Sequence, residues 1–251
     1  MLQATRNIYH GMIIDKNALP QEDDLLLSEL QESLARWEKE DAALTWLTLP
    51  AERNALVPAV MNLGFVYHNC NAAELTLVKR IKAGAFVPSF ATHYIGAGGV
   101  VINEKNQLLV ISEKAHSVKH FKLPGGLLDG GEDIAQGVVR EVFEETGIKT
   151  KFESLICLRH SHSYQFGKSD IYFVCRLTAH SSEITADPRE IHEARWMAVE
   201  EYLNREDTRP FNRLIVEAAL GENQLVPTDI SHLSSRYKNL EVFIPQGGEN
   251  E

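Results

Sequence analysis

Several acidic side chains lie close together in the middle of this 251-residue sequence, at spacings that would bring their carboxylates to one place. Five residues separate Gly126 from Glu132, and seven more lead to the run Arg140-Glu141-Val142-Phe143-Glu144-Glu145. Gly147 and Ile148 close the segment. Carboxylate oxygens are the ligands that hard divalent cations such as Mg²⁺ prefer. The segment therefore predicts chemistry assisted by a metal ion.

The spacing places three of these glutamates on one face of a predicted helix that follows Glu132. With about 100° of rotation per residue, Glu144 and Glu145 lie roughly 60° and 40° to either side of Glu141. A separate apolar face for the core contains Ala135, Val138, Val139 and Val142. Like charges three or four residues apart cost roughly 0.2–0.5 kcal/mol per pair. We expect a bound cation to offset that repulsion.

The alternative interpretation is an acidic helix face that only contacts solvent. The metal site is favoured because glycine, arginine and glutamate identities occur together in one fixed spacing. Arg140 is expected to pair with Glu132 or Glu144 and so to orient the carboxylates. The Gly125-Gly126 and Gly130-Gly131 pairs allow sharp backbone turns, and Gly147 is expected to end the helix.

The segment from Gly126 to Ile148 resembles the Nudix box, which marks hydrolases of a nucleoside diphosphate linked to another group. The resemblance implies an α+β fold: a Nudix α/β/α sandwich that contains a strand-loop-helix-loop unit and uses Mg²⁺ or Mn²⁺. It implies that Glu141, Glu144 and Glu145 are the catalytic, metal-binding carboxylates and that the Gly125 carbonyl is a further ligand. It also implies structural roles for four residues of the box, Gly126, Glu132, Arg140 and Gly147.

Composition and charge restrict the classes of function further. The 35 acidic and 25 basic residues give a net charge of −10, and no cluster of five basic residues occurs, which argues against nucleic-acid binding. No apolar window is long enough to span a membrane, and residues 1–10 do not have the pattern of a secretory signal. Cys70, Cys157 and Cys175 show no metal-binding spacing, so we expect a reducing cytoplasmic location.

The pattern of apolar residues divides the chain into a smaller N-terminal α/β domain (1–88), a Nudix domain (92–222) and a C-terminal extension (223–251). A linker is expected around 83–91, where glycine and proline occur. In the N-terminal domain we expect strands at 7–14, 43–49, 65–68 and 74–79 and helices at 23–39 and 55–63. Beyond the linker we expect strands at 94–102, 107–112, 152–159, 169–177, 194–198 and 240–244, and helices after Glu132 and at 211–219.

Two runs outside the box extend the resemblance, 166–172 (Phe-Gly-Lys-Ser-Asp-Ile-Tyr) and 187–197 (Asp-Pro-Arg-Glu-Ile-His-Glu-Ala-Arg-Trp-Met). They are similar to the plant ADP-ribose/NADH pyrophosphatases and to an animal Nudix protein encoded antisense to a fibroblast growth factor gene. Such relatives often carry a glutamate before the tryptophan strand that completes the metal site or acts as a base. Glu190 matches that place and Glu193 is the second choice, while a solvated loop acid is the alternative for Glu190.

Candidate substrate-binding residues lie near the box and in the loop at 160–168. Lys122 is placed to neutralise a phosphate, although an ordinary surface lysine is the competing interpretation, and the same applies to Lys168. His160 and His162 alternate along an extended segment, so they share one face and, with Tyr164 and Phe166, could border a base or ribose.

The expected activity is Mg²⁺-dependent hydrolysis of a nucleoside diphosphate derivative, ADP-ribose or NADH above all, to AMP and a phosphorylated product. One alternative is a dinucleoside polyphosphate hydrolase, because such enzymes place a tyrosine near the position of Tyr164. Another is a sensor or interaction protein that uses a Nudix fold to bind a nucleotide. A small-molecule nucleotide is the expected partner, and a second copy of the chain is a candidate because relatives are often dimers.

Overall fold

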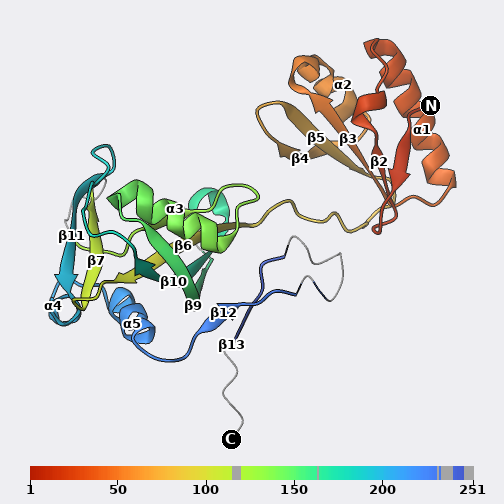
Figure 1. Cartoon of the computed structure of the whole chain (residues 1–251). Helices are drawn as coiled ribbons and strands as arrows, with labels where there is room; N and C mark the ends of the chain where they lie inside the picture. The colour runs from red at the N-terminus through yellow and green to blue at the C-terminus, as the bar shows by residue number, and fades with distance from the viewer. Residues whose placement is uncertain (115–119, 163, 231, 233–239, 246–251) are drawn as a thin grey trace, which may run out of the picture. The chain divides into compact units, whose positions relative to one another are not determined.

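The computed structural model describes residues 1–114, 120–162, 164–230, 232 and 240–245, and its chain divides into two compact units, Met1–Thr92 and His93–Glu251 (Figure 1). Each unit contains its own β-sheet and its own buried cluster of hydrophobic side chains. In the described ranges, no helix is both long enough and apolar enough to cross a membrane.

The first unit is a five-stranded sheet with the strand order β1-β2-β3-β5-β4. The strands are β1 (Ala4–Arg6), β2 (Gly11–Ile14), β3 (Leu44–Pro50), β4 (Val66–Cys70) and β5 (Glu74–Arg80). Strands β2 and β3 run parallel, and helix α1 (Asp23–Lys39) forms the crossover that a parallel pair requires. A 3-10 turn (Ala51–Leu56) leads from β3 into the short helix α2 (Val57–Asn62).

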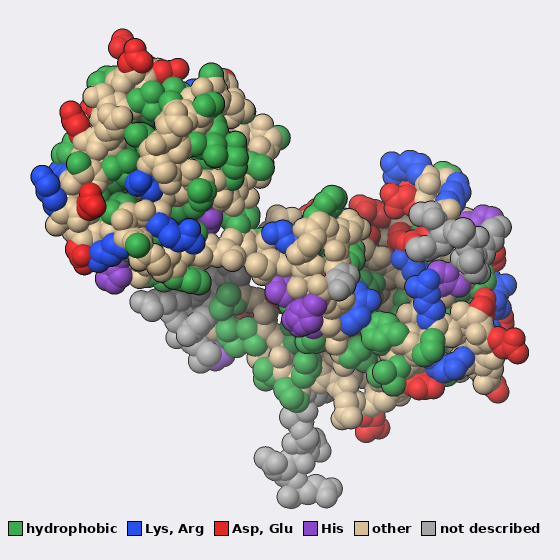
Figure 2. Space-filling model, turned by 180° about the vertical axis from the view of Figure 1, so that it is seen from behind, with side chains coloured by type: hydrophobic (Ala, Val, Ile, Leu, Met, Phe, Trp, Pro, Cys, Tyr) green, Lys and Arg blue, Asp and Glu red, His purple; other side chains and the backbone are tan. Residues whose placement is uncertain are grey.

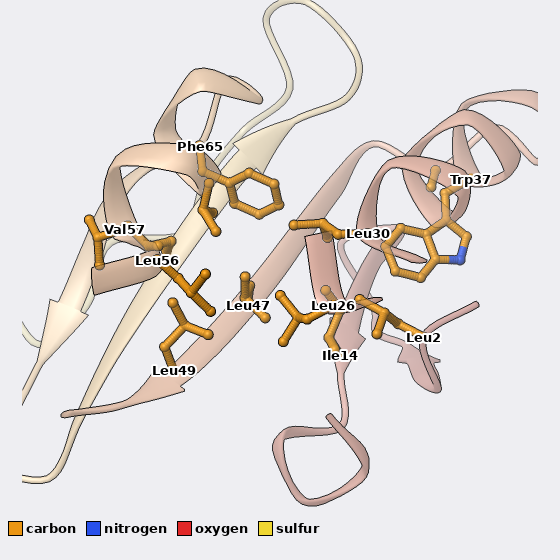
Figure 3. Packing of buried hydrophobic residues seen from close by; sticks show 13 residues of the cluster. Leu2, Ile14, Leu26, Leu30, Trp37, Leu47, Leu49, Leu56, Val57 and Phe65 are labelled. Atoms are coloured by element: carbon orange, nitrogen blue, oxygen red, sulfur yellow. The ribbon is translucent and has the colours of Figure 1, made fainter. Parts of the chain in front are cut away.

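Helices α1 and α2 cover one face of this sheet and enclose its main core (Figure 3). Leu26 and Leu30 of α1 lie beside Leu47 of β3, and all three side chains are fully buried. Phe65, just before β4, closes the core near α2. The first unit therefore has a hydrophobic core of its own.

The strand expected at 7–14 is wrong, because a tight turn divides this segment into β1 and β2. The Asn7 side-chain oxygen accepts hydrogen bonds from the backbone N–H groups of Tyr9 and Gly11, both at 3.0 Å. His10 adopts a φ of 55°, which no extended strand allows. A local side-chain hydrogen bond has therefore replaced strand pairing here.

The second unit is built on an eight-stranded mixed sheet with the order β11-β7-β6-β10-β9-β12-β13, with β8 paired to β6. The strands are β6 (His93–Ile102), β7 (Gln107–Glu113), β8 (Gly125–Leu127), β9 (Thr150–Ser161), β10 (Ser169–Ala179), β11 (Ile191–Ala198), β12 (Leu225–Pro227) and β13 (Phe243–Pro245). The helices are α3 (Ile134–Thr146), α4 (Val199–Asn204) and α5 (Pro210–Ala219).

Two buried clusters show that this sheet is the middle layer of an α/β/α sandwich. Val138 and Val142 of α3 pack against one face, together with Cys175 of β10. Tyr202 of α4 and Val216 of α5 pack against the other face (Figure 1). The fold class expected from the sequence is present.

The structure adds elements that the sequence pattern did not predict. Helix α4 was missed, and the last strand is Phe243–Pro245 rather than 240–244. Strand β12 pairs with β13 and, at Leu225, with β9, so the start of the expected C-terminal extension joins the sheet of the second unit. Residues 231, 233–239 and 246–251 of that extension lie outside the described residues.

Candidate active site

Strand β8 brings the backbone of the box against β6 and against helix α3. Gly125 has a φ of 146°, and a Cβ atom there would lie 2.3 Å from the carbonyl oxygen of Ala97. A Cβ atom on Gly126 would lie 2.5 Å from Oε2 of Glu141. Gly125 therefore requires glycine, whereas a side chain on Gly126 would have to displace the Glu141 carboxylate.

Helix α3 carries the three glutamates and is closed at both ends by specific contacts. Asp133 precedes the helix but makes no side-chain cap, and Glu241 supplies the cap instead. Its two carboxylate oxygens accept hydrogen bonds from the N–H groups of Ile134 at 2.8 Å and Ala135 at 3.0 Å. At the other end Gly147 adopts a φ of 72° and donates its N–H to the Phe143 carbonyl at 2.7 Å. The position of α3 is thus defined by residues far apart in the chain.

Arg140 binds several carboxylates of the box at once. Its Nε and Nη2 atoms donate to the two oxygens of Glu132 at 2.7 and 2.8 Å. Its Nη1 atom lies 2.8 Å from Glu141 and 3.1 Å from Glu144. The guanidinium hydrogen bond lowers the pKa of Glu132 to about 2, and the same contacts raise the pKa of Arg140. Arg140 therefore acts as an internal counter-ion that holds the carboxylates in position.

Glu145 is the buried carboxylate of the site, with 7% of its surface exposed. One of its oxygens accepts a hydrogen bond from the Gly125 N–H at 2.7 Å. Burial raises its pKa to about 7, which the Lys122 ammonium and the Gly125 N–H only partly counteract. Burial also raises the pKa of Glu141, against the opposing effect of Arg140. Both groups are therefore costly to ionise unless a cation lies close to them.

A cavity of about 340 Å³ lies between helix α3 and the loop that precedes β11. It is lined by Glu141, Glu144, Glu145, Asp187, Arg189 and Glu190. Backbone hydrogen bonds position this loop: the Asp187 N–H donates to the Glu145 carbonyl at 3.2 Å, and the Lys114 N–H donates to the Glu190 carbonyl at 2.8 Å. The structure thus brings Glu190 to the same cavity as the three glutamates of the box.

The cavity fits a divalent cation in its donor chemistry, since carboxylate oxygens from two elements surround it. Across the part of the chain that is described, however, no three acidic, histidine or cysteine side chains already converge as ligands of one ion. The contacts of Arg140 explain this arrangement, because they draw Glu141 and Glu144 toward the guanidinium. The half-exposed Glu144 side chain is free to turn toward the cavity at little cost, whereas the buried Glu145 is held by Gly125.

A second cavity of about 450 Å³ opens on the other side of Gly125 and Gly126, and we call it the cleft. Its polar and charged lining comes from Glu113, His120, Lys122, Arg159, Tyr164, Asp170, Tyr172, Arg209 and Asn212, together with the ring of Phe211. Lys122 forms an ion pair with Glu113. Gly125 lines the cleft, and its N–H binds Glu145 of the carboxylate cavity, so the cleft lies next to the candidate metal site.

The residues expected to bind substrate separate into two groups in space. Lys122 and Tyr164 line the cleft, and the Tyr164 ring stacks edge-on with Tyr94 at a centroid distance of 5.5 Å. Among the described residues, the linings of these two cavities do not include His162, Phe166 or Lys168. The Phe166 side chain is 85% exposed, on a turn where its φ is 53°.

His162 instead belongs to a group of imidazole rings on the surface of the second unit. The ring of His160 lies 4.3 Å from that of His162, and its Nε2 lies 2.9 Å from Nε2 of His93. The prediction that His160 and His162 share one face therefore agrees with their contact. Histidine side chains lie together on the face seen in Figure 2, beside basic side chains.

Several residues that line the two cavities were missed from the sequence. Asp187 belongs to the 187–197 run but was not singled out, although an acid three residues before Glu190 was a usable signal. Arg159, Arg209 and Phe211 come from the end of β9 and the start of α5, and their meeting depends on the fold alone. Glu241 lies 107 residues from Ile134, and no local pattern marks it as a helix cap.

The comparisons with known proteins agree with this architecture. A family model described as a NUDIX domain matches residues 92–219, and one described as a Nudix hydrolase domain matches residues 2–81. The chain belongs to the Nudix family and is a Nudix hydrolase. Enzymes of this family act on small-molecule nucleotides in which a nucleoside diphosphate is linked to another moiety, and they generally use divalent metal ions.

Relatives with known names cover most of the chain. Nudix hydrolase 8 of Arabidopsis thaliana is 36% identical over 96% of this chain and 70% of its own length. The human protein named nucleoside diphosphate-linked moiety X motif 6 is 32% identical over 76% of this chain and 62% of its own. Among solved structures, a MutT NUDIX hydrolase from Burkholderia pseudomallei aligns with 51% of this chain and 98% of its own, at 24% identity and a TM-score of 0.44.

Proposed function

We propose that the protein is a Mg²⁺-dependent pyrophosphatase that hydrolyses the diphosphate bond of a nucleoside diphosphate derivative, with ADP-ribose and NADH as the first candidates. The products would be AMP and ribose 5-phosphate from ADP-ribose, or AMP and reduced nicotinamide mononucleotide from NADH. The observation that carries the proposal is the single cavity shared by Glu141, Glu144, Glu145 and Glu190, next to an organic cleft.

The residues of the chain divide the chemical work between them. Glu141, Glu144, Glu145 and Glu190, with the Gly125 carbonyl, would hold Mg²⁺ or Mn²⁺. A cation held there supplies charge neutralisation of the diphosphate oxygens and acidifies bound water. Arg140 orients the carboxylates, while Glu190 or Glu141 accepts the proton of the attacking water. Lys122, which lines the cleft and interacts electrostatically with Glu145, is placed to neutralise a phosphate oxygen.

The test is phosphate-coupled turnover of ADP-ribose, NADH, diadenosine polyphosphates and coenzyme A, each with Mg²⁺, with Mn²⁺ and with a chelator. We expect hydrolysis of ADP-ribose or NADH that the chelator abolishes. Because Tyr164 lines the cleft, preferential hydrolysis of diadenosine polyphosphates would move the assignment to that substrate class. No turnover of any of the four by the folded protein would contradict the proposal.

Glu145→Gln keeps the shape of the side chain and removes its charge, so it tests the metal site directly. We expect kcat to fall by at least about a hundredfold, since even changes to residues that only support metal ligands cost ~10–100-fold. The matched control is Glu200→Gln, an exposed glutamate on α4 that lines neither cavity. Turnover of Glu145→Gln at the rate of the control would reject the assignment.

A further inference from the structure

The cleft has basic side chains besides Lys122, which is assigned above to the diphosphate. Lys122, Arg159 and Arg209 line it, against two acidic residues, Glu113 and Asp170. This leaves a local excess of one positive charge in a protein whose net charge is −10. A local positive field of this kind favours an anionic ligand.

Arg159 is held in one orientation by three neighbours. Its Nη2 atom donates to Oδ2 of Asp170 at 2.6 Å, and Asp170 is only 2% exposed. The guanidinium carbon lies 5.2 Å from the centre of the Tyr172 ring and 5.6 Å from that of Phe211. An arginine that stacks between rings and pairs with a buried acid loses little entropy when it binds a further anion.

The guanidinium of Arg159 has donors to spare. It carries five N–H groups, and Asp170 is its only hydrogen-bond acceptor among the described residues. Its Nε atom is enclosed and has no acceptor there, while the side chain as a whole remains 40% exposed. Arg209 is exposed and has no acidic partner within the described ranges. The two arginines thus offer unused donors to the same cleft.

We propose that Arg159, with Arg209, binds a second phosphate group on the part of the substrate that is not cleaved. This inference rests on the proposed pyrophosphatase function and adds to it a preference, among its substrates, for nucleoside diphosphate derivatives that carry an additional phosphomonoester. A phosphomonoester has about two negative charges and three acceptor oxygens. Two guanidinium groups therefore balance its charge and fill its acceptors better than a single guanidinium does. Tyr164, Tyr172 and Phe211 would flank the attached ribose and base.

NADPH and NADH form the pair of probes, because they differ by one 2′-phosphate. With Mg²⁺ we expect the wild-type kcat/KM for NADPH to exceed that for NADH by about tenfold, the worth of one hydrogen bond to a charged group. Arg159→Gln should lower kcat/KM for NADPH more than that for NADH and bring the two values within about twofold. Arg159→Lys, which keeps the charge but not the planar fork, should retain part of the preference.

Arg195→Gln is the matched control. Arg195 also stacks on an aromatic ring, Phe121 at 4.5 Å, and also pairs with an acid, Glu201 at 3.4 Å, but it does not line the cleft. This variant should keep the wild-type preference. Equal kcat/KM values of the wild type for the two substrates would overturn the inference. A preference that survives in Arg159→Gln, or an equal loss for both substrates in that variant, would overturn it as well.

A binding measurement separates this inference from the proposed function. Calorimetric titration with adenosine 2′,5′-bisphosphate and with AMP requires no turnover. Tighter binding of the bisphosphate by about tenfold, lost in Arg159→Gln, would support the second phosphate site even if no diphosphate were hydrolysed. Equal affinities would reject the site while leaving the pyrophosphatase assignment to the substrate panel.

Discussion

Glu145 shows how one buried carboxylate can oppose folding once it is ionised. Its carboxylate is 7% exposed, and burial raises its pKa from about 4.5 to about 7. The folded protein therefore binds a proton at this group between pH 4.5 and 7, where the unfolded chain does not. Stability from this group is complete below pH 4.5 and is lost as the pH rises through 7.

The pH dependence of the free energy of unfolding tests whether the pKa of Glu145 is raised in the folded protein. In a chelator, we expect the wild type to lose up to about 3 kcal/mol between pH 4.5 and 8 through Glu145. Glu145→Gln should lack this component, because the amide does not titrate. Urea unfolding at several pH values measures the difference between the two proteins. Parallel curves for wild type and variant would contradict a raised pKa, and added Mg²⁺ should stabilise only the wild type at pH 8.

The close approach of Gly126 to the Glu141 carboxylate leads to a second prediction for a single residue. A Cβ atom at this position would lie 2.5 Å from the Glu141 carboxylate, whereas one on Gly130 would meet nothing within 4 Å. Gly126→Ala should therefore displace Glu141 and lower kcat by about 10–100-fold, and Gly130→Ala should leave it nearly unchanged. Steady-state kinetics and the circular dichroism of both variants measure the effect. Equal activity of the two variants would show that Glu141 tolerates the shift.

At the scale of elements, helix α3 depends on a residue from the end of the described chain. Glu241 accepts two N–H groups at the start of α3, where a negative charge also interacts favourably with the helix dipole. Phe243 secures the same segment by packing on Phe152 at a ring distance of 5.6 Å. The segment around β13 therefore supports helix α3, while neither Glu241 nor Phe243 lines the two cavities.

Removal of this cap should lower stability measurably. We expect Glu241→Ala to reduce the free energy of unfolding by about 1 kcal/mol, the usual cost of a lost N-cap. Glu241→Gln keeps an acceptor oxygen and should lose less. Urea unfolding measures both effects, with the exposed Glu222→Ala as control. If Glu241→Ala matched that control, the cap would not contribute in solution.

The elements also show how far the sequence could predict the fold. Helix 23–39 was predicted to the residue, because its apolar spacing is regular and its neighbours are polar. The Glu141–Glu145 face followed from helix geometry, and Glu190 came from a resemblance outside the box. The division of 7–14 was missed because it depends on one side chain, Asn7. The cleft was missed in part because Arg159 and Phe211 lie 52 positions apart and meet only through the packing of α5 against the sheet.

At the scale of the whole molecule, the two units carry separate hydrophobic cores. Leu47 is fully buried in the first unit, and Val100 is fully buried in the second. Leu47→Ala should destabilise the first unit by about 2–5 kcal/mol, since the truncation leaves a cavity. Calorimetry of the full chain should show that this variant lowers one thermal transition, while Val100→Ala lowers the other. A single transition that both variants shift equally would mean that the units unfold as one.

The cap on α3 also has a consequence for the time course of synthesis. Ile134 and Glu241 are separated by 107 residues, so the catalytic helix leaves the ribosome long before its cap is made. At ~5–20 residues per second, the delay is roughly 5–20 s. During that interval the N–H groups of Ile134 and Ala135 lack their Glu241 acceptors. The segment around β13 must therefore be translated before helix α3 can receive this cap.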